Sequence, residues 1–214
     1  MSSSNKKTLL VEGKTEKLVI SALMEKSIIG FNKEYPPIQI ETLDGKDDIL
    51  KSIPTYIKSE NSIGIVIDAD GDFQGTWNQI YNKLEYTNQF PELPETLPLT
   101  GLVIKNEEGK RLGVWVMPNN TSQGMLETFL AFLIPKKQNE LWKTACSAVT
   151  EAKKAGAQFR KNHEDKANIY TWLAWQDPPG EDFKIAICKK TLEPNAPLAK
   201  KFVKWLCDLF EIQS

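Results

Sequence analysis

Apolar residues in the first half of the chain recur in patterns typical of alternating strands and helices. The segment 63–67 is almost wholly apolar, as expected of a central parallel strand that is covered on both faces. The polar and apolar positions of 15–26 instead recur with the period of an amphipathic helix. The pattern predicts strands at 8–12, 38–42 and 63–68 and helices at 15–26 and 72–86. Such alternation favours an α/β fold with a mainly parallel sheet flanked by helices.

The second half of the chain is predicted to be mostly helical. A proline-rich loop at 90–99 comes first, and a hairpin of 101–105 and 111–117 follows it. Beyond the hairpin, the pattern predicts helices at 124–133, 136–156, 163–175 and 197–210, with a short strand at 183–188. Residues 1–135 are therefore expected to form the main core, with 136–214 as a helical extension packed on it.

Composition excludes several classes of protein. The chain has 214 residues, of which 41% are hydrophobic and 26% charged, as in an ordinary globular protein. It has no apolar run near the ~20 residues of a membrane span, and its polar N-terminus does not resemble a secretory signal. Three separated cysteines and a single histidine argue against a disulfide framework and a structural zinc site. We therefore expect a cytoplasmic protein without membrane contact.

Charge is distributed unevenly along the chain. Residues 1–135 carry 13 basic and 18 acidic groups, whereas residues 136–214 carry 14 and 10. An acidic half could hold metal and a basic half could meet phosphate. An uneven but functionless surface would give the same numbers.

The clearest chemical motif is a series of three aspartates at the end of the apolar strand. Asp68, Asp70 and Asp72 occupy alternate positions at the carboxyl end of that strand, where open α/β sheets bind their ligands. If the backbone stays extended, Asp68 and Asp70 point the same way, and two carboxylates converge only around a cation or a proton. Oxygen ligands select Mg²⁺ or Mn²⁺. The alternative is a solvated acidic turn.

Two other families use a similar string of aspartates. An EF-hand loop needs glycine at its sixth position and glutamate at its twelfth, where this chain has Phe73 and Gln79, so that interpretation fails. A phosphatase of the haloacid-dehalogenase type also has D-x-D after an apolar strand, with the first aspartate as nucleophile. This alternative stays open, although no convincing downstream acidic pair follows.

A second acidic motif follows the first predicted strand. Glu12 ends that strand, and Gly13 allows a sharp turn into the next helix. Glu16 then lies on the helix face that carries Val19, Ile20 and Leu23. An acid on an inward face is costly without a partner, and a metal ion would supply one. Four residues from Asp44 to Asp47 also contain acids, but their pattern is that of a helix cap with Asp44 at the N-cap.

Together these motifs resemble the Toprim superfamily of topoisomerases, bacterial primases and OLD-family nucleases. A strand ending in V-E-G before a helix, followed by an apolar strand ending in D-x-D, is its signature. The extended form V-E-G-x-T-E is most similar to the OLD nucleases and to compact stand-alone OLD-like Toprim proteins. The resemblance covers roughly residues 8–135. It implies that Glu12, Glu16 and the D-x-D acids bind divalent metal for cleavage of DNA or RNA. We expect two metal ions at this site.

Two further residues are consistent with this resemblance. Glu127 is the only acid in a strongly apolar predicted helix, so its carboxylate should seek a cation; a partly exposed helix acid is the alternative. Lys166 lies on the stripe of Ile169, Tyr170 and Leu173 and resembles the lysine that OLD nucleases place near the scissile phosphate. A surface lysine with a buried stem would show the same spacing.

The remaining candidates are basic residues and partners. Lys14, Arg160, Lys161 and His163 are candidates for contact with the nucleic-acid backbone, or are simply surface residues. OLD nucleases usually carry an ATPase, and this sequence has no G-x-x-x-x-G-K-[ST] loop. By family analogy, a separate ATPase could act with this chain in an antiphage defence complex. The alternative from another class is a metal-binding interaction subunit without catalysis.

Overall fold

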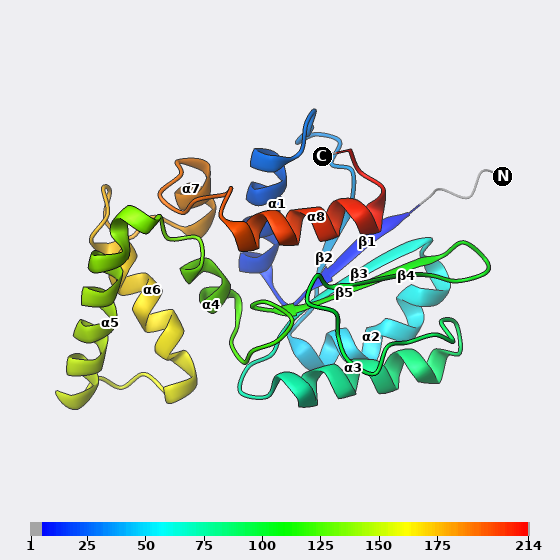
Figure 1. The fold of residues 1–214 in the computed structure, drawn as a ribbon, viewed down its shortest axis with the longest axis horizontal. Coiled ribbons are helices and arrows are strands. Elements are labelled where there is room, and N and C mark those ends of the chain that lie inside the picture. The colour runs from blue at the N-terminus through cyan, green and yellow to red at the C-terminus, as the bar shows by residue number, and fades with distance from the viewer. Residues whose placement is uncertain (1–5, 214) are drawn as a thin grey trace.

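A single five-stranded sheet forms the centre of the molecule (Figure 1). The computed structural model describes residues 6–213, so the polar residues 1–5 and residue 214 lie outside it. The strand order is β2-β1-β3-β5-β4, and only β4 is antiparallel to its neighbour. The strands are β1 Lys7–Val11, β2 Gln39–Thr42, β3 Ser62–Asp68, β4 Leu102–Lys105 and β5 Arg111–Met117. The predicted α/β class with a mainly parallel sheet is confirmed, and the arrangement is Rossmann-like.

Helices connect the strands and make up most of the chain after β5. The first three are α1 Lys14–Ser27, α2 Lys46–Ser59 and α3 Phe73–Thr87. The later ones are α4 Leu126–Ala131, α5 Asn139–Lys154, α6 Glu164–Ala174, α7 Phe183–Cys188 and α8 Pro197–Phe210, with 3₁₀ turns at Lys136–Gln138 and Lys161–His163. No helix within residues 6–213 is long and apolar enough to cross a membrane.

The two faces of the sheet are covered by different helices. Alternate residues of β3 show this division, since Ile65 and Ile67 pack in the cluster with α2 and α3, whereas Val66 packs in the cluster with α1 and α8. Figure 1 shows α8 lying across one face and α2 and α3 beneath the other. Because both faces are covered, β3 is buried from Ser62 to Ile67, which explains its nearly continuous apolar sequence.

The last helix approaches the sheet unusually closely. Gly64 of β3 and Gly113 of β5 are register partners, and the side chain of Leu209 lies over both. A Cβ atom at Gly113 would lie 2.5 Å from Leu209 Cδ2, and one at Gly64 would lie 3.0 Å from the same atom. The two glycines therefore form the shallow seat on which the end of α8 rests.

The helices α5 and α6 pack against each other, and α6 also packs against α4 (Figure 1). Both lie beyond the carboxyl ends of the parallel strands, whereas α7 packs on α1 and α8 packs on the sheet. The helices after residue 135 thus form two groups in different parts of the molecule. One group covers the sheet, and the other faces the edge where the acidic motifs end.

Three local predictions are corrected by the structure. The segment 183–188 is helix α7 and not a strand; the Asp182 carboxylate caps it by accepting a hydrogen bond from the Ile185 N–H at 2.8 Å. The N-cap of α2 is Gly45, with φ of 90°, and not Asp44. The helix predicted at 124–133 is confined to α4, because Gly124 has φ of 136° and Met125 is extended.

Candidate functional site

Glu12 and Asp68 meet at the carboxyl edge of the sheet. Glu12 directly follows β1 and Asp68 ends β3, and these strands are parallel neighbours. The Glu12 Oε1 accepts a hydrogen bond from the Asp68 backbone N–H at 2.7 Å. The structure therefore brings together the acids of the two separate motifs, because parallel strands present their carboxyl ends at one edge.

The backbone turns at Asp70 instead of continuing as a strand. Asp70 has φ of 54°, a left-handed conformation that aspartate tolerates better than most residues. Its N–H and C=O exchange two hydrogen bonds with Gly124, each 2.8 Å long. The expected extended geometry through Asp70 is therefore wrong. In its place, a short bridge fixes the acidic loop to the chain that enters α4.

Asp72 has a structural task. Its Oδ1 accepts a hydrogen bond from the Gly75 N–H at 2.9 Å and so caps the first turn of α3. Such a cap satisfies one of the free N–H groups that every helix start exposes. The third aspartate of the series is thus already engaged with the backbone.

Glu16 and Glu127 approach the edge from helices. Glu127 of α4 is only 5% exposed and forms an ion pair of 3.0 Å with Lys166 of α6, whose side chain is 49% exposed. Burial would lower the pKa of Lys166, but the hydrogen bond and charge of Glu127 outweigh it and raise that pKa. Burial raises the pKa of Glu16, and the charge of Glu127 raises it further.

Electrostatic repulsion among the acids centres on Asp68. Burial raises its pKa well above the usual range, and the nearby carboxylates add to the shift, namely Glu12, Glu16, Glu127 and Asp70. The pKa of Glu12 is also raised, first by burial, although its hydrogen bond from Asp68 and the charge of Lys46 partly offset this. The five acids thus form one coupled cluster that favours added protons or cations.

Lys46 is a member of the site that the sequence analysis missed. It is the first residue of α2, and its Nζ lies 2.5 Å from Asp70 Oδ2 and 3.1 Å from Thr76 Oγ1. The sequence signal that could have identified Lys46 is the pair Gly45-Lys46 at the start of α2, because this helix follows β2 at the carboxyl edge of the sheet. The Asp44–Asp47 pattern predicted a helix cap at this position and no charged contact for Lys46.

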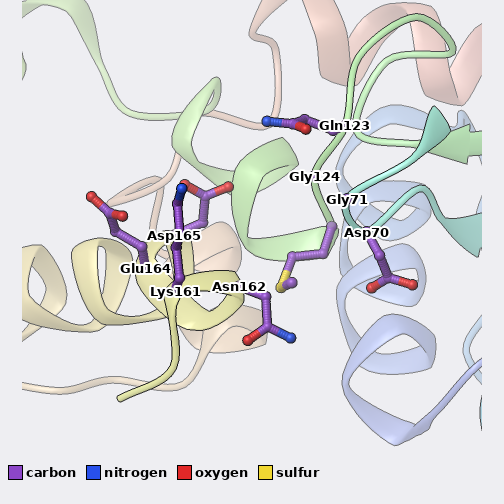
Figure 2. Close-up of a pocket in the computed structure, with 9 residues that line it drawn as sticks. Asp70, Gly71, Gln123, Gly124, Lys161, Asn162, Glu164 and Asp165 are labelled. Atoms are coloured by element: carbon purple, nitrogen blue, oxygen red, sulfur yellow. The ribbon is translucent and has the colours of Figure 1, made fainter. Parts of the chain in front are cut away.

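A groove of about 480 Å³ lies beside Asp70 (Figure 2). Figure 2 shows Asp70 on one side and the residues that begin α6 on the other. The Thr128 hydroxyl donates a hydrogen bond to the Asp165 carboxylate and so fixes α4 to that far side. The groove is lined by Asp70, Gly71, Gln123, Gly124, Met125, Lys161, Asn162, Glu164 and Asp165.

The four basic candidates are all exposed, but they do not form one surface patch at the groove. Lys161 lines it, whereas Arg160 and His163 adjoin it in sequence without lining it. Lys14 is the first residue of α1, two positions after Glu12. Of the candidates for phosphate contact, Lys161 thus has the most direct access to the groove.

The donor set suits a hard divalent cation, because it consists of carboxylates in a repulsive, partly buried cluster. Within residues 6–213, however, no three acids, histidines or cysteines are placed closely enough to hold an ion as they stand. Asp70 and Glu127 are instead paired with Lys46 and Lys166. Metal binding at this edge would require these side chains to move.

Comparison with known proteins identifies the family. A family model described as a protein of unknown function, DUF3226, matches residues 6–211, nearly the whole chain. The chain belongs to the DUF3226 family. No curated protein and no solved structure matches it. The match extends from β1 to the end of α8, so the DUF3226 unit includes the sheet, the acidic edge and the helices that face that edge.

Proposed function

We propose that this chain is a divalent-metal-dependent nuclease that cleaves phosphodiester bonds of DNA or RNA, with a Toprim-type site similar to that of OLD nucleases. The observation that carries the proposal is the crowding of Glu12 and Asp68 at the ends of adjacent parallel strands. A fold keeps such a costly arrangement where function requires it. An open groove beside the cluster gives a substrate access to it.

Each acid has a role in this proposal. Glu12, Asp68 and Asp70 would hold Mg²⁺ or Mn²⁺, and Glu16 and Glu127 would move in from the helices to complete the ligand set. Asp72 would support the loop from its capping position. Two ions about 3.5–4 Å apart would supply an activated water and stabilise the leaving oxygen.

Basic side chains would act on the phosphate. Lys166 lies close enough to the cluster to pair with Glu127, so its ammonium can neutralise charge that develops on the scissile phosphate. Lys161 would contact the nucleic-acid backbone in the groove. Arg160 and His163, its neighbours in the chain, and Lys14 at the start of α1 would be further contacts to the backbone.

The cellular setting follows from the resemblance alone. An OLD-like nuclease without its own ATPase loop would work with a separate ATPase subunit, as the effector of a cytoplasmic antiphage defence complex. This part of the proposal is independent of the cleavage chemistry. Copurification of an ATPase with the tagged chain would support it.

A metal-binding interaction subunit is the second candidate. It is favoured by the pairing of Asp70 and Glu127 with lysines, since both pairs stabilise the edge without any reaction. This candidate predicts metal-dependent assembly and no cleavage. A phosphatase acting through Asp68 would instead hydrolyse small phosphate monoesters.

Incubation with labelled plasmid, linear DNA and RNA tests the proposal. With Mg²⁺ or Mn²⁺ the wild-type chain should cut at least one substrate, and Glu12→Gln should reduce the rate by about a thousandfold or more, as expected for removing a metal-ligand charge. The amide oxygen of glutamine can still accept the Asp68 N–H, so the fold should persist. Glu85→Gln, a change at an exposed position of α3, is the matched control and should retain full activity.

Calorimetry separates binding from cleavage. The wild-type chain should bind Mn²⁺, and the double variant Asp68→Asn with Asp70→Asn should not, while its circular dichroism stays unchanged. Equal Mn²⁺ binding by a folded double variant would remove the site from these aspartates. Metal binding without cleavage of any substrate, alone or with a copurifying ATPase, would favour the interaction subunit.

A further inference from the structure

Lys46 differs from an ordinary surface lysine in where its partners lie. Its side chain is 22% exposed, and it crosses from α2 to an aspartate 24 residues away. Lys51, on the same helix, pairs with Asp48 one turn earlier at 3.1 Å, and its side chain is 73% exposed. The second pair is local and solvated. The first connects two elements at the acidic edge.

The position of Lys46 is fixed by the backbone that carries it. The Gly45 N–H donates to the Glu12 carbonyl oxygen at 3.3 Å, so the start of α2 is attached to the end of β1. Thr76 is 4% exposed; its hydroxyl donates to the Ala69 carbonyl oxygen at 3.2 Å and accepts from the Lys46 ammonium. The ammonium therefore has a second contact at the site, with Thr76, besides its contact with Asp70.

A divalent ion and the Lys46 ammonium compete for the same oxygen. Asp70 Oδ2 lies 2.5 Å from Nζ, so an ion bound there would place like charges in contact. The ammonium would have to withdraw from Asp70, while its anchor at Thr76 and the attached helix start keep it near the edge. An ammonium has three donors, and withdrawal frees at least one for an anionic oxygen.

We propose that Lys46 is a built-in cation that occupies Asp70 until a divalent ion binds, and that then turns to the phosphate group of the substrate. The inference rests on the proposed metal site and deepens it, because it names the group that receives the phosphate once the metal is loaded.

Calorimetric titration with Mn²⁺ tests the competition directly. Lys46→Met keeps the unbranched stem of the side chain and removes its ammonium, so Mn²⁺ should bind about threefold or more tightly than to the wild type, the size expected for removing a partly exposed ion pair. Lys51→Met is the matched control and should leave Mn²⁺ affinity unchanged. Weaker or unchanged binding by a folded Lys46→Met variant would overturn the competition.

A second titration tests the transfer to phosphate. Thymidine 5′-monophosphate should bind the Mn²⁺-loaded wild type more tightly than loaded Lys46→Met, and the two should not differ in chelator. Equal affinities of the loaded proteins would overturn the phosphate role. A wild-type chain that binds no Mn²⁺ would overturn the proposed metal site and this inference together, whereas Mn²⁺ binding that is insensitive to Lys46 would overturn only the inference.

Discussion

Charged side chains have opposite effects on stability at the two ends of the sheet. At the amino end, Lys7 Nζ donates to the Phe210 carbonyl oxygen at 2.5 Å, and Arg111 Nε donates to that of Leu209 at 2.7 Å. These cations thus donate hydrogen bonds to the free carbonyls at the end of α8 and interact favourably with the negative end of its helix dipole. At the carboxyl end, carboxylates such as Asp68 raise one another's pKa. Charge stabilises the fold at one end and opposes it at the other.

This difference teaches where to look for function. A protein selected only for stability would neutralise the carboxyl end as thoroughly as the amino end. Exceptions to that rule concentrate at functional sites, where stability is given up for binding or chemistry. The contrast can be tested by removing a stabilising cation at the amino end of the sheet and by removing a repelling carboxylate at the carboxyl end.

Arg111→Met should have the largest effect on stability. The arginine side chain is 19% exposed and bonds to two carbonyls of α8 and to Glu211. We expect a loss of about 2–3 kcal/mol in the free energy of unfolding, the range for hydrogen bonds to a charged group. Urea unfolding followed by tryptophan fluorescence measures it.

The control for Arg111 is Lys204→Met, which removes an exposed pair with Asp208 on the same helix. It should cost about 0.5 kcal/mol or less. Equal losses in the two variants would show that the amino end is not specially stabilised by Arg111.

Lys166→Met and Lys189→Met form an intermediate test. Each lysine is about half exposed and pairs with a buried glutamate, Glu127 for Lys166 and Glu181 for Lys189. Each variant should lose about 1 kcal/mol of stability, since the lysines are well solvated. Only Lys166 lies at the acidic edge, so only its loss should reduce cleavage, by about a hundredfold in turnover.

Stability measurements and single-turnover cleavage distinguish the two effects. A Lys189→Met variant as inactive as Lys166→Met would mean that both act through folding. A fully active Lys166→Met variant would remove Lys166 from the reaction.

Asp68→Asn should have the smallest effect, in the stabilising direction. Burial and neighbouring acids raise the folded-state pKa of Asp68 above 3.8, so the folded protein prefers the protonated form. That preference is fully present below the unfolded-state pKa and is lost as pH rises through the raised value. In chelator, the variant should therefore be more stable than the wild type at pH 8, and the difference in stability should be much smaller at pH 4.

Urea unfolding at the two pH values checks this prediction. Adding Mn²⁺ should reduce or reverse the difference in unfolding free energy between the variant and the wild type at pH 8, because only the wild type has an ionised carboxylate at position 68 to bind the ion. A variant that is less stable than the wild type at pH 8 in chelator would contradict the account of Asp68.

Much of the fold was predictable because its elements have strong periodicity. The apolar β3 and the hairpin of β4 and β5 have the predicted bounds within a residue or two. The α7 prediction failed because a short apolar run has the same appearance in a strand and a buried helix. Its cap, Asp182, was the signal that distinguishes them.

The candidate site was predictable only where it depends on strand order. Glu12 and Asp68 follow neighbouring parallel strands, so their meeting follows from topology. The contact of Lys46 with Asp70 could not be derived, because it depends on where α2 begins and on a left-handed turn at Asp70. Such details are set by tertiary packing and not by the local pattern.

The glycine seat under Leu209 has a consequence for the order in which the molecule can fold. The helix α8, which rests on Gly64 and Gly113, is the last of the described elements to be synthesised. Lys7 is 203 residues away in sequence from its hydrogen-bond partner, Phe210. Until α8 emerges from the ribosome, the sheet face around Trp115 is an uncovered apolar surface. Contacts so distant in sequence slow folding, and uncovered surface promotes aggregation. Completion of this face is therefore a late step in folding, and the partly folded chain is most prone to aggregation before it.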